Sequence, residues 1–535
     1  MGTRDLVFLS LLAGGAAALG ASLLPQRLPE RPREVAVTGP RETDLAETVS
    51  EVDRAFREQW RAEGIVPTAP VSELNVVRRL SLGLTGTIPS LEEIRTLERL
   101  PREDWIRQWT ERLLRDRRYA DHVAERFARA FVGTENGPFI VFRRRRFVTW
   151  LSDQIHENRR YDQITRDLIA SDGIWTDRPA TNFMTVTYDP EAKRFDPERL
   201  AGRVSRAFLG ARIDCAQCHD HPFAAWKQAD FQGLAAFFGK AESGFTGVHE
   251  GEGEYKPKDR ATGEPRDVAP RVPFAEDCLP DRGEPRQRLA SWLTDPKNPA
   301  LARATVNRAW GLAFGRPLVE PVDDLPDEES LPPALTILAR DFVEHGYDLR
   351  RLFRLIASTE VFQLDSAGDP APGVKEERAW AAFPLSPLRP EQVVGALSQT
   401  ASVKTIDGES PILMRIFKSF EEADFVKRYG DLGEEEFEPH AGTIPQRLLL
   451  MNGKLVREKT KPELLSASKQ IAMFAPTDRD AIEAAYLTVL SRVPTAEEYA
   501  HFEASLRGSR GDERGRRLAD LMWTLINVTE FSWNH

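Results

Sequence analysis

The motif Cys215-Ala216-Gln217-Cys218-His219 is the strongest chemical signal in the sequence. With three cysteines and nine histidines among 535 residues, a chance C-x-x-C-H match is rare. Two thiols at this spacing can form thioethers to the two vinyl groups of one porphyrin, and the next histidine then lies under the iron as its proximal ligand. The motif therefore predicts haem c attached to Cys215 and Cys218, with His219 as the ligand of the haem iron.

Two other chemistries could use the same cysteines. Cys215, Cys218 and either His219 or His221 could supply three ligands to zinc, and Cys278 the fourth, which would employ every cysteine of the chain. A disulfide between Cys215 and Cys218 is the third interpretation, although no βαβ pattern surrounds them and a structural bridge does not need His219. The expected cofactor is haem c, with zinc or no cofactor as the alternatives.

The first 24 residues have the features of an export segment. Arg4 precedes a small and apolar run over residues 6–24, and the three alanines at 16–18 offer a cleavage site for a signal peptidase. The run is also nearly long enough to span a bilayer. Residues 1–24 are therefore predicted to be a signal peptide or an N-terminal anchor, and the protein to be periplasmic or anchored to the membrane.

The charge balance limits the partners. The chain has 73 basic and 83 acidic residues and a net charge of −10, which argues against nucleic-acid binding because phosphate contacts need a basic field. We expect a redox partner or a cell-surface component, and contact with a membrane only through the N-terminal segment. No P-loop, G-x-S-x-G, H-E-x-x-H or dinucleotide-binding motif is found, so no enzyme class is indicated.

The elements that must position the motif are predicted to be helices. Residues 25–48 form a linker rich in Pro, Arg and Glu, and residues 49–240 and 285–535 show apolar residues at helical spacing. Between them, residues 241–284 are rich in Gly, Glu, Lys and Pro and predict a long irregular loop. The expected fold is mainly α, with two helical domains and few short strands, of which Met184–Tyr188 is the best candidate.

Two helix starts and one ion pair can also be predicted. Ser90 with Glu93, and Thr495 with Glu498, have the spacing of capping boxes, in which the hydroxyl accepts from a backbone amide and the glutamate reaches back. Arg308 lies on a helix whose other faces are apolar. A buried arginine needs a carboxylate, and Asp323 or Asp324 is near in the sequence, so we expect a structural ion pair there.

At the cysteine motif the sequence resembles a known family. Residues 75–86, VSRAFLG (204–210), CAQCHDHPFAAW (215–226) and DFQGLAAFF (230–238) are similar to the first domain of exported planctomycete proteins that pair DUF1549, also called PSCyt2, with DUF1553, or PSD1. Residues 298–324, 443–453 and 530–535 are similar to the second domain.

The resemblance implies a DUF1549-like domain over residues 49–240 and a DUF1553-like domain over 285–535. Because the first domain is named for its C-x-x-C-H, the resemblance implies a cytochrome-c-like protein with an electron-transfer or redox role. It supplies no reaction. The alternatives are a non-haem metal-binding protein and a structural or polysaccharide-associated protein.

Overall fold

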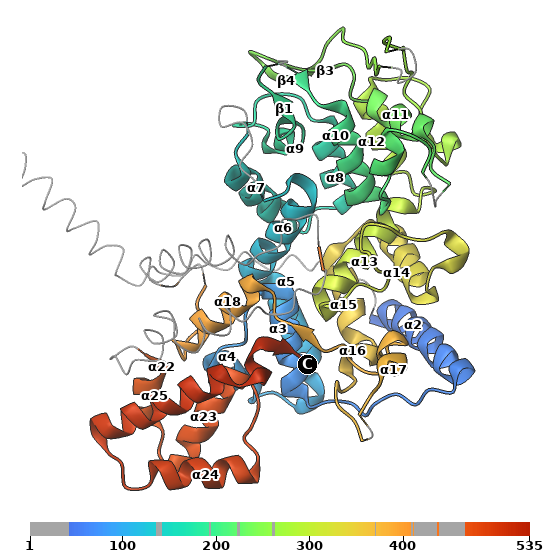
Figure 1. Ribbon diagram of the computed structural model, residues 1–535. Coiled ribbons are helices and arrows are strands. Elements are labelled where there is room, and N and C mark those ends of the chain that lie inside the picture. The colour runs from blue at the N-terminus through green and yellow to red at the C-terminus, as the bar shows by residue number, and fades with distance from the viewer. Residues whose placement is uncertain are drawn as a thin grey trace, which may run out of the picture.

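The fold is mainly α-helical, as the sequence predicts (Figure 1). The computed structural model describes residues 42–134, 142–191, 194–221, 225–258, 263–369, 371–407, 410, 436–437 and 466–535. The predicted export segment lies outside these residues. In the described part of the chain, no helix combines the length and the apolar character needed to cross a bilayer.

Helices precede the 241–284 segment almost without interruption. They are α2 (Glu42–Glu63), α3 (Glu73–Thr85), α4 (Leu91–Leu97), α5 (Trp105–Arg115), α6 (Arg117–Val132), α7 (Arg144–His156), α8 (Tyr161–Ala170), α9 (Asn182–Thr185), α10 (Pro197–Val204) and α11 (Gln228–Ala236). Short 3₁₀ turns are η1 (Arg102–Asp104), η2 (Pro179–Thr181) and η4 (Asp214–Gln217), and η3 (Ser205–Leu209) is a π-helix. The first turns of α2 occupy residues 42–48, inside the predicted linker.

Helices dominate the second half as well. They are α12 (Pro285–Leu293), α13 (Ala300–Phe314), α14 (Pro333–Glu344), α15 (Leu349–Ser358), α16 (Glu360–Gln363), α17 (Val374–Arg378), α18 (Pro390–Thr400), α22 (Ala467–Phe474), α23 (Asp478–Leu490), α24 (Ala496–Leu506) and α25 (Gly511–Asn527). The 3₁₀ turns are η5 (Glu276–Cys278), η6 (Glu328–Ser330) and η7 (Thr529–Ser532).

The strands are short, as predicted, but they are not where the sequence placed the best candidate. An antiparallel sheet runs in the order β1 (Tyr188–Asp189), β2 (Arg194–Phe195), β3 (Ala241–Gly244), β4 (Gly247–Glu250), and β5 (Ser386–Pro387) pairs with β6 (Trp533–Asn534). Most of the predicted strand Met184–Tyr188 is instead the end of α9 and the turn after it.

One continuous hydrophobic core joins helices from both sides of the 241–284 segment. It contains buried side chains from α2 through Phe383. On α13, Trp310 is fully buried and stacks on Phe314 with ring centroids 4.3 Å apart, and Phe56 of α2 lies 5.9 Å from Trp310. Elsewhere α14 packs on α2 and α12 on α8. The two predicted helical domains therefore share one interior.

The 241–284 segment is less irregular than predicted. It contains the β3–β4 hairpin and η5, and it places Val248, Tyr255 and Val272 in the shared core. These apolar residues are spaced too widely to show a period, which is why the composition of the segment predicts a loop.

A second core lies among α18 and α22–α25, the group drawn in orange and red in Figure 1. Leu82 of α3 and Ile88 also belong to this second core, which therefore packs against α3. Both predicted capping boxes are confirmed: Ser90 and Glu93 start α4, and Thr495 and Glu498 start α24.

Two buried arginines of α3 bind the region around η7 and β6. Arg78 Nη2 donates to the Phe531 carbonyl at 3.1 Å, and Arg79 Nε donates to the His535 carbonyl at 2.7 Å. Burial lowers the pKa of Arg78 to about 10 and that of Arg79 to about 9. Arg79 also donates to two carbonyls beside α16, so α3 connects both hydrophobic cores.

Candidate functional site

The cysteine motif begins in the 3₁₀ turn η4, between η3 and α11. Gly210 ends η3 with a φ of 62°, in the left-handed region that favours glycine. Ala216 is fully buried and holds the turn against the core, whereas Cys215 is exposed and Cys218 half-buried. Cys218 directly follows η4, and both thiols remain accessible to solvent.

His219 has one nitrogen engaged and one available. Its Nδ1 lies 2.7 Å from the carbonyl oxygen of Asp220. A carbonyl oxygen only accepts, so Nδ1 carries the proton and Nε2 keeps its lone pair. A hydrogen bond of this kind fixes the tautomer and the ring orientation of histidines that bind metals through Nε2.

Two side-chain bonds hold the motif against the helices before it. Arg206 Nε donates to Asp214 Oδ2 at 2.8 Å, and Gln217 Nε2 donates to Glu198 Oε2 at 2.5 Å. A Cβ at Gly202 would lie 2.9 Å from Asp214 Oδ1, so only glycine lets this carboxylate approach α10 so closely. Residues on either side of Cys215 are thereby fixed to α10 and η3.

Cys278 lies in a different element from the other two cysteines. It is buried in η5, with Sγ 4.0 Å from Asp277 Oδ1, and burial and nearby aspartates raise the pKa of its thiol. Within the described residues, no three His, Cys, Asp or Glu side chains are grouped so as to hold a metal ion. The zinc alternative, with Cys215, Cys218, His221 and Cys278 as ligands, is not assembled there. All three cysteines are free thiols, so no Cys215–Cys218 disulfide is present.

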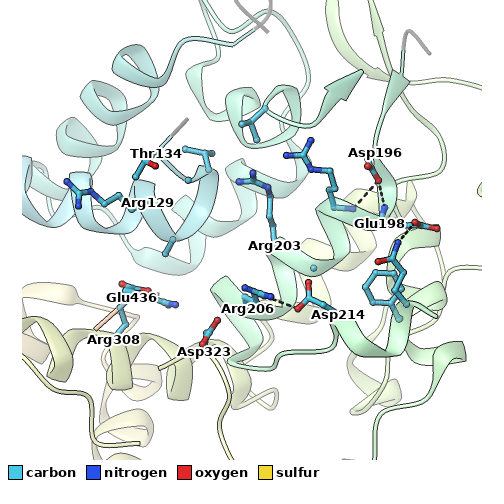
Figure 2. Close-up of a pocket in the computed structure, with 18 residues that line it drawn as sticks. Arg129, Thr134, Asp196, Glu198, Arg203, Arg206, Asp214, Arg308, Asp323 and Glu436 are labelled. Carbon is cyan, nitrogen blue, oxygen red and sulfur yellow. Dashed lines mark hydrogen bonds and ion pairs between the residues drawn. The ribbon is translucent and has the colours of Figure 1, made fainter. Parts of the chain in front are cut away.

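A polar cavity of about 500 Å³ adjoins the motif (Figure 2). Asp214 and Gln217 form part of its wall. Its charged lining consists of five arginines and five acidic residues: Arg129, Arg199, Arg203, Arg206, Arg308, Asp196, Glu198, Asp214, Asp323 and Glu436. The cavity is bounded by α6, α10 and η3 on one side and by α13 on the other, which lie before and after the 241–284 segment.

Arg308 forms the floor of this cavity, and its partner differs from the predicted one. Its Nε donates to Glu436 Oε2 at 2.9 Å and its Nη1 to the carbonyl of Ala207 at 3.0 Å. Burial would lower the pKa of Arg308, but Glu436 outweighs this and raises it. Asp323 instead accepts from Arg212 Nε at 2.8 Å. The predicted ion pair exists, but its carboxylate is Glu436 rather than Asp323 or Asp324.

None of the sequence motifs indicates this cavity, but the regular spacing of three arginines does. Arg199, Arg203 and Arg206 are spaced by four and three residues, which places them on one face of a continuous helix. This spacing predicts a basic helical face. Glu436 carried no such signal, because it comes 128 residues after its partner.

Comparison with known proteins identifies two domains. Residues 51–243 match the model PSCyt2, described as a protein of unknown function (DUF1549), and residues 285–413 match PSD1, a protein of unknown function (DUF1553). No curated protein and no solved structure matches the chain. The first match contains the cysteine motif, and the second contains Arg308 and Asp323 on the opposite side of the cavity. The chain therefore contains a DUF1549 (PSCyt2) domain followed by a DUF1553 (PSD1) domain.

Proposed function

We propose that the DUF1549 domain carries covalently attached haem c on Cys215 and Cys218, with His219 as proximal ligand, and that the protein is exported and has an electron-transfer role. The observation that carries the proposal is the bond between His219 Nδ1 and the Asp220 carbonyl, 2.7 Å long. It leaves Nε2 as the ligand atom, as a proximal histidine requires. The N-terminal segment supports export, and haem attachment of this type takes place outside the cytoplasm of bacteria.

Cys215, Cys218 and His219 are the residue types that attachment of haem c requires. Cys215 and Cys218 are free thiols with access to solvent, and their spacing suits the two vinyl groups of one porphyrin. Each thiol would add across one vinyl group, forming one carbon–sulfur bond. When bound, haem supplies one-electron chemistry at its iron. The chain contributes the two attachment points, the orientation of His219, and the ties from Asp214 and Gln217 that fix the turn.

Attachment can be tested by producing the full chain together with a cytochrome c maturation system. We expect a pyridine haemochrome spectrum of the c type and a mass increase of one haem per chain. Cys215→Ala removes one thioether, so the haemochrome band should shift or disappear. His219→Ala should keep any haem already attached but change its absorption spectrum, because the proximal ligand is gone.

Cys278→Ala is the matched control, since Cys278 is buried in η5 away from the motif. This variant should carry as much haem as the unmodified protein. A colourless protein of unchanged mass under maturation conditions would refute the proposal. Fractionation of cells that produce the full chain tests export separately, because the haem-bearing protein should be found outside the cytoplasm.

A further inference from the structure

We infer that the cavity between α6, α10, η3 and α13 is a binding site for a hydroxylated anion, that is, an acidic sugar bearing a carboxylate, sulfate or phosphate group. The inference is independent of haem attachment, because neither cysteine of the motif lines the cavity. It rests on three features: unpartnered polar atoms on the floor, an unpaired arginine on the wall, and the polar character of the lining.

The floor has a donor and an acceptor that the protein does not satisfy. Arg308 is 2% exposed, and only its Nε and Nη1 have partners, so Nη2 makes no hydrogen bond with the described residues. Asp323 is 6% exposed and accepts only through Oδ1, which leaves Oδ2 without a partner in the same set. The buried Glu436 Oε1, on the partner of Arg308, also has no hydrogen-bond partner among the described residues. A ligand with both an acceptor and a hydroxyl would satisfy them.

The wall has a cation to match an anionic group. Arg199 of α10 is exposed and lines the cavity. Its guanidinium has no ion pair or hydrogen bond with any residue that the structure describes, whereas Arg206 and Arg308 are paired with Asp214 and Glu436. A guanidinium matches the planar oxygens of a carboxylate and those of sulfate or phosphate through two parallel N–H bonds. This makes Arg199 the expected contact for the charge of the ligand.

The remaining lining selects for a polar ligand. Arginines and carboxylates both line the cavity, and Figure 2 shows the paired Arg206 and Asp214 next to Asp323. Carboxylates accept hydrogen bonds from hydroxyl groups, and guanidinium groups donate to sugar oxygens. A simple anion would use Arg199 alone, and a neutral sugar would leave it unused. A sugar with one acidic group uses both kinds of contact.

Calorimetric titration of the full chain tests the inference. The probes are D-glucuronate, D-glucose 6-sulfate and D-glucose 6-phosphate, which distinguish the three acidic groups, with D-glucose and sodium sulfate as comparisons. We expect at least one acidic sugar to bind at least tenfold more tightly than both glucose and sulfate. If no acidic sugar shows this preference, the inference is overturned, including the case in which sulfate alone binds equally well.

Two variants locate the binding. Arg199→Ala removes an exposed side chain and should fold normally, and it should weaken binding at least tenfold. Asp323→Asn should also weaken binding, because it removes a carboxylate acceptor from the floor of the cavity. Arg54→Ala is the matched control, because Arg54 is an exposed arginine on α2 with no described partner. Unchanged affinity in Arg199→Ala, or an equal loss in Arg54→Ala, would overturn the assignment of the site.

Discussion

At the scale of single residues, ion pairs within the interior are the dominant feature. The sequence predicts that Arg308 needs a carboxylate, because a guanidinium with no partner is costly to bury. It cannot predict Glu436, since nothing local connects residues 128 positions apart. The cysteine motif and the two capping boxes are different, because their partners lie within four residues. Local spacing therefore predicts local chemistry, whereas the partner of a buried charge depends on the whole fold.

Arg308→Met should destabilise the protein by about 3–5 kcal/mol, because it leaves Glu436 charged and buried without its partner. Denaturation in urea measures the change in unfolding free energy. The double variant Arg308→Met with Glu436→Leu removes both charges and should recover most of that loss. A single variant that costs less than about 1 kcal/mol would show that the pair is unimportant.

At the scale of elements, side chains join helix ends to distant segments. Arg492 follows α23 and donates to Glu498, the N3 residue of the α24 capping box, at 2.8 Å. It also donates to Glu530 in η7 at 2.6 Å. Burial would raise the pKa of Glu530, but hydrogen bonds from His535 and Arg492 lower it to about 2. One arginine therefore orders three elements.

This network predicts a pH dependence. Because the folded-state pKa of Glu530 lies below its unfolded value, its stabilising effect is present above about pH 4.5 and is lost as the pH falls toward 2. Glu530→Gln should therefore cost about 2 kcal/mol at pH 7. The difference in Tm from the unmodified protein should shrink steadily between pH 5 and pH 3.

Glu513→Gln provides the comparison, since Glu513 forms an exposed i,i+4 pair with Arg517 on α25. Such pairs contribute about 0.3–0.5 kcal/mol, so its Tm should change little at either pH. A Glu530→Gln effect that is equally large at pH 3 and pH 7 would contradict the ionic explanation.

Some elements could be predicted from the sequence and others could not. The amphipathic spacing of Trp105, Trp109 and Leu113 predicts α5, and all three are buried. Met184–Tyr188 has the β-branched and aromatic residues of a strand, yet α9 forms from Asn182 to Thr185. Asn182 through Thr187 are buried, so packing on every side overrides the weak preference of a short segment.

At the scale of the whole molecule, the two family domains form one body. Their shared core extends from α2 to Phe383, and the cavity lies between them. The composition of residues 241–284 predicts a linker, and a linker suggests separate domains. The composition shows which residues are apolar but not which residues they pack against. The shared interior therefore could not be predicted from composition.

The DUF1549 part alone should not fold stably. A chain of residues 1–284 lacks α13 and α14, which cover α3 and α2, and so exposes a large apolar surface. We expect it to bind the dye ANS and to unfold without a cooperative transition, whereas the full chain should unfold cooperatively. Cooperative unfolding of the fragment with a Tm within a few degrees of the full chain would contradict the shared core.

The contacts of Arg79 also limit when this part of the protein can fold during synthesis. Its partner His535 comes 456 residues later. At about 5–20 residues per second, a ribosome needs roughly 20–90 s to cover that distance. The carbonyls of Phe362 and Leu364 that Arg79 also binds are made earlier, but those of Phe531 and His535 are made only after residue 530. The contacts that α3 makes with η7 and β6 can therefore form only after most of the chain has been made.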